Sequence, residues 1–330
     1  MINPKQHLSP KLFKKTIDMA PTRQGYGEGL VIAGEKNNQI VVLCADLTDS
    51  TKSNLFKEQF PDRFIEVGVA EQGMATIAAG MANYGKVPFI SSYAAFSPGR
   101  NWEQIRTTIA LNDVPVKIAG AHTGVSVGPD GATHQMLEDM ALMRAMPNML
   151  VIAPADSLET KKATIEAAAN GKPTYLRFAR EKTPVFTTDT SPFKIGKATI
   201  VWETKDPQVA IIACGPLVYE ALLAAKELSK TLDVLVINSH TLKPLDDQAI
   251  IRAARTCGAV VTVEEHQITG GLGGAVAETL ARNFPVPIEF IGMPDHFGES
   301  GAPDELLTKY GMKAESIIKA VKKVLTRKNS

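Results

Sequence analysis

The sequence predicts an α/β protein built from two consecutive doubly wound domains with mainly parallel sheets. Three observations favour this fold. Short apolar runs rich in β-branched residues alternate with stretches of helical character along the whole chain. The apolar runs are nearly continuous, which is typical of parallel strands covered on both faces. A segment rich in Pro, Thr, Asp and Ser at 183–195 divides the alternation into two series.

The first series alternates six expected strands with four expected helices, which is the pattern of a doubly wound domain. The strands are expected at 39–45, 64–69, 87–91, 116–121, 149–153 and 173–178. The helices are expected at 29–37, 71–83, 101–111 and 157–169.

The second series repeats the same alternation after the break. Its strands are expected at 209–213, 234–237, 259–263 and 288–291, and its helices at 216–230, 246–255, 272–282 and 314–325. The sequence therefore predicts a first domain over 1–185, a linker over 186–198 and a second domain over 199–330.

The composition is that of an ordinary globular protein. The chain has 330 residues and a formal net charge of +1, so we expect neither nucleic acid nor a membrane as a partner. No apolar run reaches the roughly 18 residues of a membrane helix, and the N-terminus lacks the apolar core of a signal peptide. Cys44, Cys214 and Cys257 form no CxxC pair and are expected to be buried thiols of a cytoplasmic protein.

Glu71 directly follows an expected strand and opens an expected helix. A carboxylate at a helix N-terminus is favoured by about 0.3–1 kcal/mol, so capping alone explains this position. A functional role is the alternative, because open α/β sheets bind ligands at the carboxyl ends of their strands. Gly68, Ala70 and Gly73 leave room there for a flat ring.

Further polar and aromatic residues follow other expected strands. Tyr93 and Phe96 are either core residues or an aromatic slot for a heteroaromatic ring. The glycine-rich segment 121–138 concentrates His122, Asp130 and His134, although Gly-Pro-Asp-Gly is also a good turn. The spacing of these residues fits no common zinc pattern, so no metal site is expected in this chain.

Two more groups have both a structural and a functional interpretation. Asp46 and Ser50 follow the first expected strand. They form either a turn and helix cap or part of a functional site. Arg23 and Arg180 are surface or ion-pair residues, or a bidentate clamp for a phosphate.

The second half contains a glycine-rich segment, TGGLGGAVAE, at 269–278. It lacks the full dinucleotide fingerprint, and close packing of a helix on a strand explains it better. Glu264, Glu265 and His266 end the strand before it and are expected to be structural or interface residues, with a role at the rim of a site as the alternative.

Together these segments resemble transketolase. The resemblance rests on ADLTDS, PDRFIEVGVAEQGM, SSYAAF with WEQIR, AHTGVSVGPDGATHQMLEDMALMRAMPNM, KPLDD and VTVEEHQITGGLGGAV, in this order. It runs from about Arg23 to the final helix and covers the pyrimidine-binding and C-terminal domains of the family. The Gly-Asp-Gly motif with a distant Asn, which holds diphosphate and metal in the family, is missing. The chain therefore resembles the C-terminal subunit of a split transketolase.

The resemblance implies a role for each candidate residue. Thiamine diphosphate would be contacted by Asp46, Leu47, Val69, Glu71, Tyr93 and Phe96, with Glu71 bonded to N1′ of the aminopyrimidine ring in an apolar cleft. His122, Asp130 and His134 would contact the sugar, and Arg23, Ser50 and Arg180 would clamp its phosphate. Glu71, His122 and His134 would be the catalytic residues. An N-terminal subunit would hold the diphosphate with Mg²⁺ or Ca²⁺ in an α2β2 assembly.

The loop 97–100 appears one residue longer than in the family, so the register of Tyr93 and Phe96 depends on where that residue is placed. The implied activity is transfer of a two-carbon ketol unit between sugar phosphates in the pentose phosphate pathway. The alternatives are a split enzyme for an unusual sugar phosphate, an enzyme like 1-deoxyxylulose-5-phosphate synthase, a 2-oxo acid dehydrogenase β subunit, or a scaffold without activity.

Overall fold

The first sheet has seven strands in the order β12-β6-β7-β5-β4-β2-β3, in a computed structural model that describes residues 1–328. Six of them are parallel: β2 (Ile40–Cys44), β3 (Phe64–Glu66), β4 (Val87–Tyr93), β5 (Lys117–Ala121), β6 (Leu150–Ile152) and β7 (Thr174–Arg177). Every residue of β2, β5 and β7 is buried, as expected for parallel strands covered on both faces.

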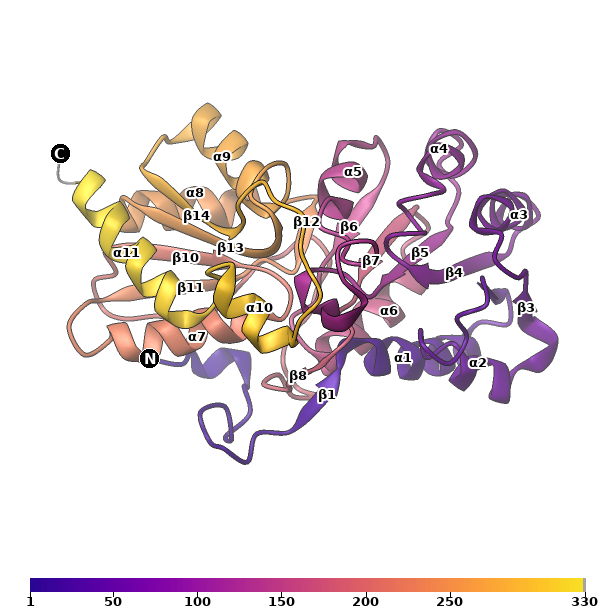
Figure 1. The fold of residues 1–330 in the computed structure, drawn as a ribbon, viewed down its shortest axis with the longest axis horizontal. Coiled ribbons are helices and arrows are strands. Elements are labelled where there is room, and N and C mark those ends of the chain that lie inside the picture. The colour runs from indigo at the N-terminus through magenta and orange to yellow at the C-terminus, as the bar shows by residue number, and fades with distance from the viewer. Residues whose placement is uncertain (329–330) are drawn as a thin grey trace.

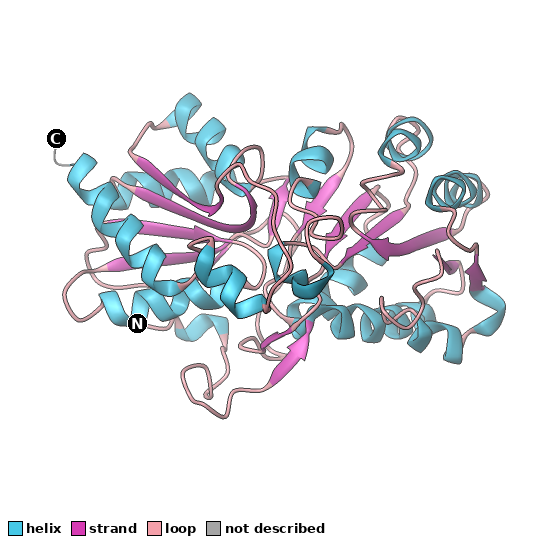
Figure 2. Cartoon of the chain, in the orientation of Figure 1, coloured by secondary structure: helices cyan, strands magenta, loops and turns pink. Residues whose placement is uncertain are grey.

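Helices cover both faces of this sheet (Figures 1 and 2). On one face lie α1 (Thr22–Lys36), α2 (Asn54–Gln59) and α6 (Ser157–Ala169). On the other lie α3 (Glu71–Asn83), α5 (Asp139–Ala145), and α4 (Trp102–Gln104) continued by a π-helical segment, η3 (Ile105–Ala110). Two short 3-10 helices, η2 (Pro61–Arg63) and η4 (Val125–Asp130), lie in the loops. The predicted doubly wound architecture is therefore confirmed for the first half.

The second sheet has the order β14-β13-β10-β11-β9. Its strands β10 (Val209–Ala213), β11 (Val234–Asn238), β13 (Val260–Gln267) and β14 (Ile288–Met293) are parallel, and β9 (Thr199–Trp202) is an antiparallel edge. Helices α7 (Leu217–Leu228) and α11 (Ala314–Lys328) pack on one face, and α8 (Asp247–Cys257) and α9 (Leu272–Asn283) on the other. Helix α10 (Pro303–Lys309) lies next to η4 of the first half.

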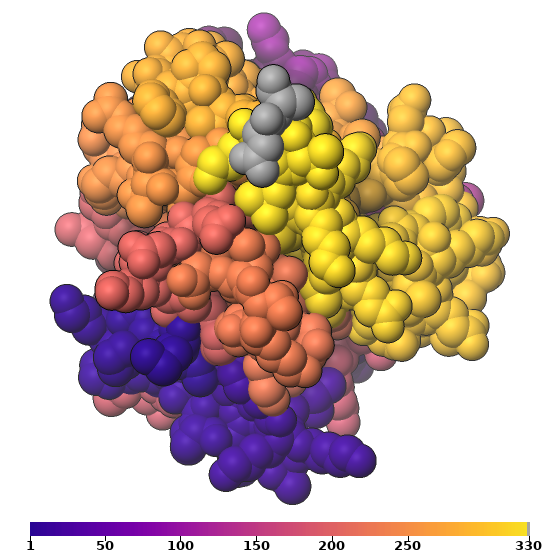
Figure 3. Space-filling view, turned by 90° about the vertical axis from the view of Figure 1, so that its left-hand side faces the viewer, coloured from indigo at the N-terminus to yellow at the C-terminus, as the bar shows by residue number. Residues whose placement is uncertain are grey.

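Two segments cross between the halves. Strand β12 (Thr241–Lys243) leaves the second half and pairs antiparallel with β6. The N-terminal residues, including η1 (Pro4–Gln6), pack on the second core through Leu8, Leu12 and Phe13, and Figure 3 shows them in indigo against that end of the molecule. Strand β1 (Met19–Pro21) pairs with β8 (Lys182–Pro184), so this small sheet joins the two ends of the first half. The boundaries at 185 and 199 therefore stay a prediction.

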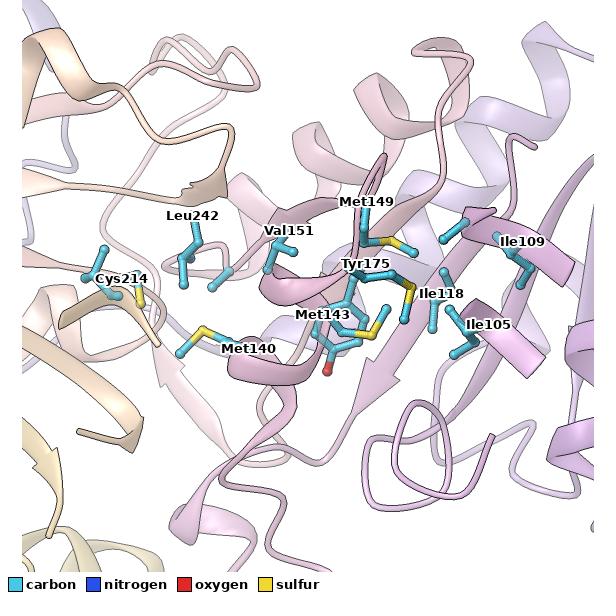
Figure 4. Close-up of a cluster of buried hydrophobic side chains, with 14 of the residues drawn as sticks. Ile105, Ile109, Ile118, Met140, Met143, Met149, Val151, Tyr175, Cys214 and Leu242 are labelled. Atoms are coloured by element: carbon cyan, nitrogen blue, oxygen red, sulfur yellow. The ribbon is translucent and has the colours of Figure 1, made fainter. Parts of the chain in front are cut away.

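The two halves share one apolar core (Figure 4). Met140 and Met143 of α5, with Val151 and Tyr175 of the first sheet, belong to the same buried cluster as Cys214 and Leu242 of the second half. Cys44, Cys214 and Cys257 are all buried and free. In the described part of the chain, no helix combines the length and apolarity needed to cross a membrane.

Candidate active site

Five parallel strands deliver the candidate residues to one edge of the first sheet. Asp46 follows β2, Glu71 follows β3, Tyr93 ends β4, His122 follows β5 and Arg180 follows β7. This is the carboxyl edge, where open α/β sheets bind their ligands. The structure therefore brings together residues that are far apart in the sequence.

Glu71 is the first residue of α3 and only 2% exposed. Its Oε2 accepts a hydrogen bond from Arg100 Nη1 at 2.8 Å, and its backbone oxygen accepts one from Asn101 Nδ2 at 2.9 Å. The resemblance implied an apolar cleft around this carboxyl group. The structure adds a cation to that picture, because a charge-assisted hydrogen bond from Arg100 reaches the carboxyl group.

Arg100 was not predicted from the sequence. Its guanidinium lies 4.9 Å from the centre of the Phe96 ring, and 48% of its side chain is exposed. It belongs to the loop 97–100, whose extra residue was the one available signal. Tyr93 and Phe96 both contribute to the site, with ring centres 6.0 Å apart and planes within 19°.

Two histidines complete an aromatic cluster around Tyr93. The ring of His122 stacks on Tyr93 at 3.8 Å, and the ring of His134 meets Phe96 edge-on at 5.5 Å. His134 Nδ1 is 2.9 Å from the hydroxyl of Thr133. Tyr93, Phe96, His122 and His134 therefore form one continuous wall of rings from two different loops.

His122 is held as a neutral side chain. Burial lowers its pKa to about 3, and the positive charges of Arg23 and Arg180, with His134, act in the same direction. The residue is 2% exposed, and its Nδ1 has no hydrogen-bond partner in the described chain. A buried ring nitrogen without a partner is available to a ligand hydroxyl.

Arg23 and Arg180 bring two guanidinium groups to the same side of the site. Arg23 Nη1 donates to the backbone oxygen of Ser50 at 2.6 Å, and Arg180 Nη1 donates to the backbone oxygen of Val127 at 2.7 Å. Arg23 Nε is buried without a partner in the described chain. Desolvation lowers the pKa of Arg23, and the charge of Arg180 adds to this effect. The pair is suited to a phosphate or another oxyanion.

The remaining candidates lie around this centre without a ring or ion-pair contact to it. Asp46 and Asp130 are exposed, Leu47 is half-buried, and Val69 is 70% exposed. Glu66, which was not predicted from the sequence as a site residue, accepts hydrogen bonds from the backbone nitrogens of Asp46 and Gly68 at 2.8 and 3.0 Å. Glu66 therefore fixes the loop after β2 against the loop that leads to Glu71.

The glycine-rich segment of the second half binds a protein carboxylate. Glu264 accepts hydrogen bonds from the backbone nitrogens of Leu272 and Gly273, both at 2.7 Å. A Cβ on Gly273 would lie 2.7 Å from the Phe290 ring, so the close packing predicted from the sequence is observed. Over residues 1–328 there is no group of three or more His, Cys, Asp or Glu side chains arranged to hold a metal ion.

Two family models match the chain. The transketolase pyrimidine binding domain matches residues 18–185, and the transketolase C-terminal domain matches residues 196–317. The chain is 45% identical over 303 residues to a putative transketolase C-terminal section of Methanocaldococcus jannaschii, which covers 91% of this chain and 94% of that protein.

Two further similarities are relevant to the site. The chain is 40% identical over 308 residues to a 6-deoxy-6-sulfo-D-fructose transketolase subunit of a Clostridium species, covering 93% and 95% of the two chains. A solved structure described as a split gene transketolase, inactive beta4 tetramer, aligns with a TM-score of 0.86 and 43% identity over 93% of this chain and 98% of that one. The chain therefore belongs to the transketolase family, as a C-terminal section of the split type.

Proposed function

We propose that the chain is the C-terminal subunit of a thiamine diphosphate enzyme that transfers a two-carbon ketol unit from a ketose phosphate to an aldose phosphate. The proposal is carried by one observation: a buried carboxyl group, Glu71, shares a sheet edge with neutral His122 and the arginines Arg23 and Arg180. Action in the cytoplasm, within the pentose phosphate pathway, is part of this proposal.

The residues present fit the ring half of the cofactor. Family membership implies thiamine diphosphate, whose aminopyrimidine ring needs a carboxyl group at its N1′ and apolar or aromatic neighbours. Glu71 supplies the carboxyl group, and Tyr93 and Phe96 lie in the adjacent loop. A Cβ on Gly68 or Gly73, which flank Glu71, would meet no atom within 4 Å, so the space beside the carboxyl group is open.

Thiamine diphosphate supplies a nucleophilic carbon and an electron sink when it is bound. The chain's own residues then have separate tasks. Glu71 holds a proton at the ring nitrogen, and Asn101 fixes the backbone of Glu71. The neutral ring of His122, together with the ring of His134, accepts or donates hydrogen bonds at the sugar hydroxyls and carbonyl oxygen. Arg23 and Arg180 bind and orient the terminal phosphate.

A partner subunit is part of the proposal, because the chain carries no diphosphate and metal motif. We expect that partner to hold the diphosphate with Mg²⁺ or Ca²⁺, and two copies of each chain to form the active α2β2 unit. The similar solved structure is described as an inactive tetramer of β chains, which agrees with a need for the other chain. Val69, apolar and 70% exposed beside Glu71, is available for contact with the partner or cofactor.

A second substrate class has a specific observation in its favour. One relative, which aligns with this chain over 95% of the relative's length, is described as a 6-deoxy-6-sulfo-D-fructose transketolase subunit. That sugar ends in a sulfonate. Two arginines bind a sulfonate and a phosphate through the same oxygen geometry. The arginine pair in this chain therefore suits either terminal group.

The test uses the chain mixed with a partner subunit that carries the Gly-Asp-Gly motif and a distant Asn, with thiamine diphosphate and Mg²⁺. We expect conversion of xylulose 5-phosphate and ribose 5-phosphate, and little cofactor binding by this chain alone. Parallel reactions with 6-deoxy-6-sulfofructose, with pyruvate plus glyceraldehyde phosphate, and with 2-oxo acids separate the alternatives. Turnover of a 2-oxo acid, without ketol transfer from any sugar, would overturn the proposal.

A further inference from the structure

The loop that carries both histidines of the site is enclosed by the second domain. This loop, residues 122–135, is called the histidine loop below. It contains η4 and lies beside α10 and the segment before it, as the centre of Figure 1 shows. The second domain therefore contacts the candidate substrate half of the site, although all the residues assigned to that half belong to the first domain.

Glu265 of β13 is the main polar contact. The residue is 3% exposed, and its Oε1 accepts a hydrogen bond from the backbone nitrogen of Ser126 at 2.7 Å. The approach is close, because a Cβ on Gly124 would lie 2.2 Å from the same oxygen, and Gly124 has a φ of 84°. A side chain at position 124 would therefore expel the carboxylate.

Glu265 is itself fixed by a buried ion pair. Its backbone oxygen accepts a hydrogen bond from Arg177 Nη2 at 2.8 Å, and Arg177 Nε donates to Asp139 Oδ2 at 2.7 Å. The side chains of Arg177 and Asp139 are 4% and 0% exposed. Both residues belong to the first domain, so the position of Glu265 is defined relative to the first sheet.

The segment 298–303 closes the other side of the histidine loop. Gln135 Nε2 donates to the backbone oxygen of Glu299 at 2.9 Å and to those of Val125 and Gly128 inside the loop. A Cβ on Gly298 would lie 1.8 Å from Gln135 Oε1. Ser300 and Pro303 contact the loop at Gly131 and Gly128, where a Cβ would lie within 2.6 and 3.0 Å of them.

The contact with Glu265 continues directly to the phosphate side of the site. Ser126, which donates to Glu265, is followed by Val127, whose backbone oxygen accepts the hydrogen bond from Arg180. At the start of the loop, His122 stacks on Tyr93. A shift of Ser126 therefore moves the acceptor that orients Arg180 and changes the loop that carries His122.

We propose that Glu265 of the second domain is a positioning residue for the substrate half of the site, holding the histidine loop so that Arg180 and His122 face a sugar phosphate. This inference rests on the proposed function for its substrate. It assigns the C-terminal domain a task beyond assembly. Glu71 makes no hydrogen bond to the histidine loop in the described chain, and Tyr93 and Phe96 contact that loop only through the rings of His122 and His134, so cofactor binding should depend on Glu265 less than substrate binding does.

The test compares Glu265→Ala, Glu265→Gln and a matched control, Glu264→Ala, in the complex with the partner. Glu264 is an equally buried neighbour on the same strand, but it holds α9 and not the histidine loop. We expect Glu265→Ala to raise KM for the sugar phosphate about tenfold, because the variant loses one hydrogen bond to a charged group. The concentration of thiamine diphosphate for half-maximal activity should change less than twofold.

The glutamine variant retains an acceptor for Ser126 and should restore KM to within about threefold of the wild type. The control should lower the melting temperature with an unchanged KM. An unchanged KM in Glu265→Ala, or equal losses of substrate and cofactor affinity in Glu265→Ala and Glu264→Ala, would overturn the inference.

Hydrogen exchange on the chain alone separates this inference from the proposed function. In Glu265→Ala, amides 124–127 should exchange about tenfold faster, while those of β4 and β5 keep their protection. Unchanged exchange in that segment would overturn the inference even if the complex is active. Faster exchange with an inactive wild-type complex would support the positioning contact and count against the proposed function.

Discussion

The carboxylate of Glu71 and the guanidinium of Arg100 form an ion pair of 2.8 Å in which the acid is 2% exposed and the base is 48% exposed. The guanidinium of Arg100 therefore lies closer to solvent than the carboxylate of Glu71. A ring nitrogen that binds Glu71 must share the carboxylate with Arg100 or displace it toward solvent. The contact also explains how a buried carboxylate is tolerated before a cofactor is present.

Replacement of Glu71 tests the proposed chemistry. Glu71→Ala should abolish turnover, and Glu71→Gln, which keeps the size of the side chain, should reduce kcat by at least about a hundredfold because proton transfer at the ring nitrogen is lost. Steady-state turnover with the partner measures the loss, and far-ultraviolet circular dichroism of the variant should match that of the wild type. Full activity in either variant would exclude the proposed role.

Replacement of Arg100 tests the ion pair in the chain alone. Arg100→Ala leaves Glu71 buried without its cation, and we expect the free energy of unfolding to fall by about 1–2 kcal/mol, between the values for surface and buried pairs. Denaturant unfolding measures this change. Arg106→Ala is the matched control, because Arg106 is exposed and makes no ion pair within residues 1–328. Equal free energies of unfolding for Arg100→Ala and Arg106→Ala would mean that the ion pair between Arg100 and Glu71 contributes little to stability.

Replacement of the two site arginines tests the phosphate clamp. Arg23→Ala and Arg180→Ala should each raise KM for a phosphorylated ketose by about 10–100-fold, since each removes a charged hydrogen-bond donor. KM for an unphosphorylated ketose should stay within about twofold of the wild-type value. Arg282→Ala, an exposed arginine of α9, serves as the control. If KM rises equally for the phosphorylated and the unphosphorylated ketose, the two arginines do not bind the terminal phosphate.

A buried carboxyl group between the halves should make stability depend on pH. Burial raises the pKa of Glu159 from 4.5 to about 8, and the neighbouring charge of Asp156 adds to this rise. Between about pH 4.5 and 8, Glu159 therefore keeps its proton in the folded chain but has lost it in the unfolded chain. Its contribution to stability is complete below about pH 4.5 and is lost as the pH rises through about 8.

Glu159→Gln imitates the protonated side chain and retains an acceptor for Asn238, which donates to Glu159 at 2.8 Å. We expect the variant to flatten the dependence of melting temperature on pH between about 5 and 8. Glu166→Gln is not a suitable control, because Glu166 is half-buried and accepts a hydrogen bond from the backbone nitrogen of Ile195. Glu58→Gln on α2 is preferable, because Glu58 is exposed and accepts only from the side chain of Asn54, one turn away on the same helix. A wild-type slope that persists in Glu159→Gln would assign the dependence to other groups.

The sequence predicted the parallel strands and main helices because each has a clear apolar pattern. Helices α3 and α6 begin and end where predicted, and each begins just after a strand, with Asp156 capping α6. Helix α1 begins at Thr22 rather than at 29, because Gly25, Gly27 and Gly29 hide its pattern. The predicted helix 101–111 is divided into α4 and a π-helical segment.

What could not be predicted depends on contacts between distant segments. Strand β12 has only three residues and takes its partner from the other half of the chain. The pairing of Arg100 with Glu71 depends on the path of a loop, and the pairing of Glu265 with Ser126 depends on how the domains pack. The roles assigned to Asp46, Leu47, Val69 and Asp130 stay predictions, because Asp46, Val69 and Asp130 are exposed and Leu47 is half-buried in the chain alone.

The exchange of segments between the halves has a consequence for the integrity of the molecule. The edge strand β12 of the first sheet comes from the second half of the chain, and the second core is covered by residues from the N-terminal end of the chain. After a single proteolytic cut in 186–198, the two polypeptides should stay associated through the pairing of β12 with β6 and through the shared apolar core. We therefore expect the two halves to unfold together, because each half completes the buried core of the other.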